Sequence, residues 1–212
     1  MADGTRTVDN GSVRLSVSEA DGRILELSHD ELGIDLIGEP RLAEGWRLLV
    51  AHPGGVMPIR SADQDPPAIR SGPDGLALRW KAVRFEGEEL DIAVEQELRL
   101  DGETLTARMR LENRSGHQIE EAYPLCVGGM ANWDEQDDWR MCVPGIIFGG
   151  EEWDFYRQFP GTYLGYRKPV FAFTYPGSSI DYWQQNLSMP WASLYNRERG
   201  VGAYFANHNP DV

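Results

Sequence analysis

The sequence predicts an all-β protein, folded as one large antiparallel β-sandwich. Three observations support this prediction. Apolar and polar residues alternate with a period of two through the first 120 residues, which is the pattern of half-buried strands. Turn residues recur about every 10–12 positions, a spacing typical of sandwiches. No stretch of roughly ten or more residues has helical periodicity without an interrupting Gly or Pro, and a length of 212 residues suits one domain over positions 1–212.

The first expected strand is Val13–Val17, after which Asp21-Gly22 turns the chain. Further short apolar segments are expected to form strands at Ile24–Leu27, Ile34–Ile37, Trp46–Ala51 and Leu76–Phe85. Residues 54–67 are rich in Gly and Pro, and we expect them to form a long surface loop.

The clearest unit is a hairpin from Leu90 to Asn113. Apolar residues and one glutamine alternate along its first arm, and apolar residues alternate again along its second arm. Between the arms, Asp101-Gly102 predicts a type I′ turn, because both central positions of that turn favour Gly, Asn or Asp. Two later strands are expected at Pro190–Asn196 and Val201–Asn207.

The formal net charge is −14, from 34 acidic and 20 basic residues. A field of this sign repels phosphate backbones and anionic lipids, so neither nucleic acid nor a membrane surface is an expected partner. Met1–Ser12 lacks the central apolar segment that a signal peptide requires, and this favours a cytoplasmic location. The only cysteines, Cys126 and Cys142, have no CxxC spacing, and we expect buried thiols rather than a disulfide.

Aromatic residues are concentrated in the last part of the chain. Of seven Trp, eight Tyr and seven Phe, only Trp46, Trp80 and Phe85 precede residue 121. The later part mixes aromatics with Gly, Pro, Asp and Asn, and this composition suits a polar ligand that also has an apolar face. Sugars fit that description best, since their C–H faces stack on aromatic rings and their hydroxyls accept and donate hydrogen bonds.

The densest candidate site is the segment 175–191. Trp183 and Trp191 would supply stacking platforms, while Asp181 and the amides at 184–186 would bind hydroxyls. An alternative for Trp191 is that it faces the core of its strand together with Tyr195. The candidate substrate-binding residues are Trp153, Asp181, Trp183, Gln185, Asn186, Trp191 and His208.

No catalytic, metal or cofactor site is predicted. Trp133–Trp139 contains four acids that could hold Ca²⁺, but the spacing of an EF-hand loop is absent, and a solvated acidic loop is expected. Glu151, Glu152 and Asp154 offer carboxylate pairs, yet neighbours in sequence rarely face each other across a scissile bond. The Gly-Gly pairs lack the Lys-Ser/Thr context of a phosphate-binding loop.

Three segments carry a family resemblance: Tyr175-Pro-Gly, Ser188–Asn196 and Gly200–His208. They resemble the end of the N-terminal, galactose-mutarotase-like supersandwich domain of glycoside hydrolases in which this β-domain precedes a (β/α)8 catalytic barrel. The resemblance covers nearly the whole chain, but its specific part is limited to residues 175–208. It implies a carbohydrate-associated domain that is not catalytic alone. It also implies that the chain is a fragment whose partner is the missing C-terminal barrel.

Two other functions are compatible with the same residues. An aldose 1-epimerase would need a histidine acid and a glutamate base, for which His117 or His208 with Glu120 or Glu121 are the candidates. Neither histidine lies in a motif of that family. The third interpretation is a structural scaffold whose aromatic patch docks the catalytic barrel.

Overall fold

The computed structural model describes residues 4–38, 40, 43–53, 55–127, 139–142, 152–154 and 191–206. For 139–142, 152–154, 191, 192 and 194 it describes the backbone alone. Contacts group the chain into two compact units, Met1–Asn132 and Trp133–Val212, and each is considered by itself. The described residues contain strands and one 3-10 turn, η2 (Ser61–Asp63), but no α-helix. The all-β prediction is therefore confirmed.

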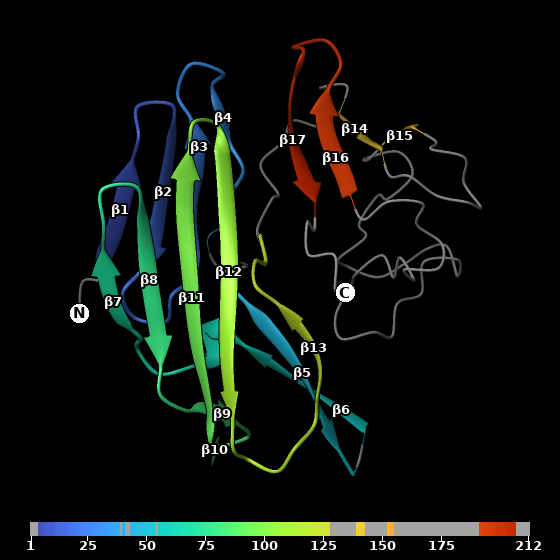
Figure 1. Ribbon diagram of the computed structural model, residues 1–212. Helices are drawn as coiled ribbons and strands as arrows, with labels where there is room; N and C mark the ends of the chain where they lie inside the picture. The colour runs from blue at the N-terminus through green and yellow to red at the C-terminus, as the bar shows by residue number, and fades with distance from the viewer. Residues whose placement is uncertain are drawn as a thin grey trace. The chain divides into compact units, whose positions relative to one another are not determined.

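The first unit contains three larger antiparallel sheets and a short hairpin (Figure 1). Sheet 1 has the order β1 (Thr5–Asp9), β2 (Val13–Ser18), β3 (Ile24–His29) and β4 (Ile34–Asp35). Sheet 2 has the order β12 (Thr104–Asn113), β11 (Ile92–Asp101), β8 (Gly75–Trp80) and β7 (Ala68–Ser71). Sheet 3 has the order β13 (Ile119–Tyr123), β5 (Arg47–His52) and β6 (Gly55–Arg60), and the hairpin joins β9 (Val83–Phe85) to β10 (Glu88–Leu90).

The second unit contains sheet 4, which is also antiparallel. Its order is β15 (Glu152–Asp154), β14 (Trp139–Cys142), β16 (Trp191–Asn196) and β17 (Val201–Ala206). The strands predicted at Pro190–Asn196 and Val201–Asn207 are thus confirmed as β16 and β17 within one residue at each end.

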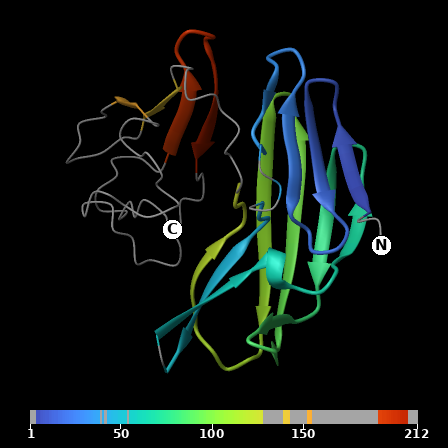
Figure 2. The same ribbon diagram turned by 180° about the vertical axis from the view of Figure 1, so that it is seen from behind.

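Sheets 1 and 2 turn their apolar sides toward one core. Figures 1 and 2 show the strands β1–β3 on one side of the first unit and β8 and β11 on the other. Along β2, β8 and β11 every second residue is buried, as the period-two pattern predicts. In β1 only Val8 is buried, and in β3 Ile24 and Leu27 are. The fully buried aliphatic side chains of the two sheets include Leu15, Val17 and Ile24 from sheet 1 and Leu78, Val94 and Leu98 from sheet 2.

Two tryptophans lie at the centre of this core. The rings of Trp46 and Trp80 meet edge to face, with centroids 5.2 Å apart and an interplanar angle of 81°. Gly22 packs against the second indole so closely that a Cβ at this position would lie 2.6 Å from Cζ2 of Trp80. These two early tryptophans therefore fill the interior of the first unit.

The hairpin β11–β12 confirms the strongest sequence prediction. Ten consecutive residue pairs join its arms, from Ile92 opposite Asn113 to Asp101 opposite Thr104. The predicted type I′ turn is wrong. The loop residues are Gly102 and Glu103, and only Gly102 has a positive φ, of 56°. A glycine at the first central position alone is the pattern of a type II′ turn, which fits the strand twist equally well.

The long surface loop expected at 54–67 is also wrong. Its first part is β6, which pairs with β5, and its second part contains η2. Met57 and Ile59 alternate into the core. Pro58 is tolerated because β6 is the last strand of sheet 3, where one side of the backbone lacks a neighbouring strand among the described residues.

Buried polar groups connect the sheets of the first unit. The Gln96 side chain is fully buried, and its Nε2 donates to the carbonyl of Gly45 at 3.0 Å and to that of Pro124 at 2.8 Å. On the surface, Asn10 Nδ2 in the β1–β2 turn donates to the carbonyl of Gly102 at 2.8 Å.

No helix among the described residues is both long and apolar enough to cross a bilayer.

Candidate functional site

The hairpin β16–β17 carries the exposed aromatic surface that the structure describes. Six residue pairs hold it together, and among them Ser193 faces Tyr204 and Tyr195 faces Gly202. Side chains alternate between the two faces of a strand, so these four residues share one face of the hairpin. Residues directly opposite and two positions away are cross-strand neighbours, which places the two tyrosines roughly 7–8 Å apart as a diagonal pair.

The turn after β16 is fixed by its first residue. Asn196 is 1% exposed, and its Oδ1 accepts a hydrogen bond from the backbone N–H of Arg199 at 2.7 Å. The Asn196 carbonyl accepts a second bond, from the N–H of Gly200 at 3.0 Å. Asn favours this position because its short side chain replaces a backbone acceptor in a tight turn. The turn sets the register that brings the two tyrosines together.

We call Ser193, Tyr195 and Tyr204 the tyrosine face. Tyr204 is 61% exposed, whereas Ser193 and Tyr195 are half-buried. The opposite face of β17, formed by Val201, Ala203 and Phe205, is half-buried throughout, in contrast to the exposed residues between them. Strand β17 therefore covers Val201, Ala203 and Phe205 in part and exposes Tyr204 on its other face.

This arrangement combines a flat apolar platform with hydroxyl groups. A tyrosine ring can stack on the C–H face of a sugar or another small ring, while phenolic and serine hydroxyls donate and accept hydrogen bonds. Both tyrosines also make further interactions in the protein. The sequence offered a core position for Tyr195 only as an alternative, and it did not single out Tyr204, because the sharing of a face depends on register and not on periodicity within one strand.

Most of the candidate substrate-binding residues lie outside the described residues. This group consists of Asp181, Trp183, Gln185, Asn186 and His208. The acidic segment 133–138 also lies outside them.

Trp153 and Trp191 lie on β15 and β16, where the structure describes the backbone. In the register of sheet 4, Trp153 pairs with Met141, which pairs in turn with Leu194, whereas Trp191 pairs with Ala206. Leu194 and Trp191 are three positions apart on β16. Because successive positions alternate, the positions of Trp153 and Trp191 fall on opposite faces of this sheet.

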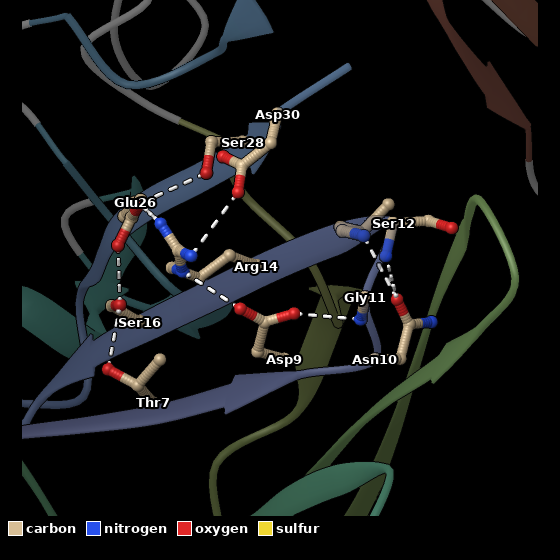
Figure 3. A network of polar contacts seen from close by, with 11 residues as sticks. Thr7, Asp9, Asn10, Gly11, Ser12, Arg14, Ser16, Glu26, Ser28 and Asp30 are labelled. Carbon is tan, nitrogen blue, oxygen red and sulfur yellow. Dashed lines mark hydrogen bonds and ion pairs between the residues drawn. The ribbon is translucent and has the colours of Figure 1, made fainter. Parts of the chain in front are cut away.

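A second polar constellation lies on the outer face of sheet 1 (Figure 3). Arg14 occupies its centre, with Nε 3.0 Å from Asp9 Oδ2 and Nη2 3.3 Å from Asp30 Oδ2. A further ion pair joins Nη1 to Glu26 Oε1 at 3.7 Å. Three carboxylates from β1, β3 and the following turn therefore surround one guanidinium on β2.

Hydroxyl groups complete this network. Glu26 accepts hydrogen bonds from Ser16 at 2.8 Å and from Ser28 at 3.0 Å, and Ser16 also contacts Thr7 at 2.9 Å. The pKa of Asp9 is lowered, first because the backbone N–H of Gly11 donates to it and then because Arg14 does. Since these polar groups satisfy one another, the network serves to connect three strands rather than to bind a ligand.

A third cluster surrounds Arg47 on sheet 3. Arg47 contacts Glu44 through Nη2 at 2.8 Å and 3.0 Å and through Nε at 3.2 Å. Tyr123, directly opposite Arg47, donates to Glu121. Cys126 is a free thiol nearby, and burial raises its pKa to about 12. A thiol that stays protonated at neutral pH is a poor nucleophile.

Three of the residues considered for an epimerase, His117, Glu120 and Glu121, lie close together in sequence. His117 is half-buried in the turn before β13, and its carbonyl accepts from Asn113 Nδ2 at 2.7 Å. Glu120 and Glu121 are exposed on β13, where the pairing with β5 shifts register between Ile119 and Glu121. The other histidine, His208, lies outside the described residues.

In the described ranges no three His, Cys, Asp or Glu side chains converge as metal ligands would. The tyrosine face is therefore the arrangement best suited to a ligand in the part of the chain that the structure describes. In comparisons with known proteins, no protein-family model matches the sequence, and no curated protein matches it.

Proposed function

We propose that this chain is a carbohydrate-associated β-sandwich domain of the supersandwich type, which accompanies the catalytic barrel of a glycoside hydrolase and is not catalytic alone. In this proposal the domain contacts sugar through aromatic and amide side chains of its last third. The catalytic carboxylates belong to the barrel, and the complex is cytoplasmic.

The tyrosine face is the observation that carries the proposal. Three large hydrophobic side chains are exposed among the described residues, and Tyr204 is the aromatic one. It is 61% exposed, more than the aliphatic Val56 at 47% and Leu32 at 39%. An exposed tyrosine ring can stack on the apolar face of a ligand ring. The hydroxyl groups of the second tyrosine and the serine can then bind the polar groups at the rim of that ring. This chemistry matches the sugar preference that the composition of residues 121–212 predicts.

The layered packing of the first unit supports the sandwich part of the proposal. The inward residues of sheets 1 and 2 are aliphatic and buried, while the outer face of sheet 1 carries the Arg14 network. Two sheets with apolar inner sides and polar outer sides are the arrangement of a β-sandwich.

Isothermal titration calorimetry with a panel of monosaccharides and oligosaccharides tests the proposal. We expect at least one sugar to bind, and we expect Tyr204→Ala to weaken that binding at least about fivefold, because loss of an aromatic contact costs about 1 kcal/mol. Trp183→Ala is expected to act in the same direction.

Val56→Ala provides the matched control, since Val56 is also exposed but lies on β6 in the other unit. It should leave the affinity unchanged. If no sugar in the panel binds, or if Tyr204→Ala and Val56→Ala behave alike, the tyrosine face is not a sugar-binding surface. The scaffold interpretation would then replace the proposal.

A further inference from the structure

Strand β12 forms one end of sheet 2 (Figure 1). Its outer side pairs with no other strand among the described residues. The strand is ten residues long and contains no Gly or Pro, and its register with β11 is uninterrupted. Long edge strands of this kind are normally shortened, bulged or broken by proline, because their unpaired backbone groups attract other strands. β12 has none of these three protections.

The hydrogen bonding at the end of the hairpin shows which backbone groups point outward. The N–H of Arg114 donates to the carbonyl of Asp91, so the pair Ile92–Asn113 is of the non-hydrogen-bonded type. Pair types alternate along an antiparallel ladder, and the even-numbered residues of β12 therefore bond to β11. The odd-numbered residues direct their N–H and C=O groups to the open edge, and these are Leu105, Ala107, Met109 and Leu111.

The side chains of those same residues form an apolar row. They lie on the core side of sheet 2, opposite Val94, Gln96, Leu98 and Leu100 of β11. The β11 residues are buried, but the four residues of the β12 row are only half-buried. The apolar surface of the core thus continues to the open edge and is incompletely covered there. An added strand would cover it with its own inward side chains.

The exposed face of β12 carries two arginines at alternate positions, followed by Glu112, whose carboxylate contacts Arg114 at 2.7 Å. Arg108 and Arg110 are exposed, and within the described part of the chain neither forms an ion pair. Glu97 and Glu95 are their cross-strand partners, but Glu95 instead contacts Arg70 of β7 at 3.7 Å. Two arginines at alternate positions present charge to any strand laid beside β12.

We infer that β12 binds an extended peptide strand whose residues alternate between acidic and apolar side chains. The outward backbone groups of Leu105, Ala107, Met109 and Leu111 pair with its main chain. Its apolar residues extend the core-side row, and its carboxylates face Arg108 and Arg110 on the other side. A second copy of this chain is a poorer partner, because two β12 strands paired around residues 108–110 would set arginine opposite arginine.

Fluorescence anisotropy with a labelled seven-residue peptide of alternating glutamate and valine tests the inference on the whole chain. We expect saturable binding that weakens as salt is raised, and binding at least about tenfold weaker for the same peptide with lysine in place of glutamate. Ala107→Pro should abolish binding. It removes an outward N–H while leaving the β11–β12 hydrogen bonds intact, and proline is accepted at such edge positions.

Charge reversal gives a second variant that does not alter the backbone. Arg108→Glu with Arg110→Glu should weaken binding of the glutamate peptide at least about tenfold. Arg79→Glu is the matched control, because Arg79 is exposed on β8 and is separated from the open edge by two strands. It should change binding less than twofold. Circular dichroism confirms that each variant is folded.

Three results would overturn the inference. The first is equal binding of the glutamate and lysine peptides, and the second is unchanged binding by both Ala107→Pro and the double charge reversal. The third is a dimer in size-exclusion chromatography that Ala107→Pro converts to monomer, which would show that a second copy occupies the edge. None of these results bears on sugar binding by the tyrosine face.

Discussion

At the scale of single residues, the contact between Gly22 and Trp80 determines the packing in the core of the first unit. Gly22 has a φ of 74°, and its Cα lies against the indole of Trp80. Both features exclude a side chain, the first through backbone strain and the second through the lack of space. The sequence shows Asp21-Gly22 only as a turn, whereas the packing gives the same glycine a second role.

Replacing Gly22 with alanine should therefore destabilise the protein by more than the strain alone. We expect Gly22→Ala to lower the free energy of unfolding by about 2–4 kcal/mol, from strain of about 1 kcal/mol and overpacking of about 1–3 kcal/mol. Gly11→Ala is the control, since Gly11 has a φ of 89° but no atom lies within 4 Å of the position that a methyl group would occupy. Urea denaturation measures both, and equal losses would contradict a packing role for Gly22.

The thiol of Cys126 provides a second prediction at this scale. Burial raises its pKa from 9.0 to about 12, so the thiolate fraction at pH 8 falls roughly a thousandfold. In a Cys142→Ser background, a disulfide reagent should react with the native protein far more slowly than with the denatured protein. As pH rises from about 9 toward 12, only the unfolded chain loses this proton, so the contribution of Cys126 to stability declines over that window. Rapid labelling of the native thiol at pH 8 would contradict the burial.

At the scale of elements, period-two patterns predicted the positions of strands, and they predicted a pairing where two strands form one hairpin. Val13–Val17 and Leu90–Asn113 correspond to β2 and to the hairpin β11–β12. The strand β6 was not predicted in the 54–67 segment, because Gly and Pro are typical of loops. Here Gly55 begins the strand and Pro58 lies within an edge strand, and both positions tolerate these residues. Leu76–Phe85 is divided into β8 and β9, since residues 81 and 82 leave the ladder.

The turn of the hairpin β16–β17 supplies a prediction for an element. Asn196→Ala should speed amide hydrogen exchange across β16 and β17 by about tenfold, because loss of a buried side-chain acceptor costs about 1–2 kcal/mol. Asn113→Ala is the matched change in an exposed turn, where Asn113 Oδ1 accepts from the N–H of Ser115 at 3.1 Å. Its effect on β12 and β13 should be smaller, and the reverse order would contradict the role of burial.

At the scale of the whole molecule, the first unit contains an extensive hydrophobic core. The buried hydrophobic side chains that the structure describes all precede residue 101, and they come from sheets 1, 2 and 3. Hydrogen bonds from Asn10 and Gln96 join those sheets within the same unit. The first unit thus contains a core of its own, as an independently folding domain requires.

A chain truncated after Asn132 should therefore fold. We expect cooperative thermal unfolding by circular dichroism, and we expect Gly22→Ala to lower its midpoint by about 5–15 °C, as in a domain of roughly this size. A truncated chain that unfolds without a cooperative transition would show that the first unit depends on residues 133–212.

The amino-acid sequence alone was enough to predict the all-β class and most strand positions, because alternation of apolar and polar residues is a local property. The sugar-like ligand that its composition suggests stays a prediction. Only the tertiary structure decided that Tyr204 and Tyr195 share a face, that the positions of Trp153 and Trp191 do not, and that β12 ends its sheet. These properties depend on which distant strands pair and in what register. A shift of one residue moves every side chain to the other face without altering the pattern along the strand.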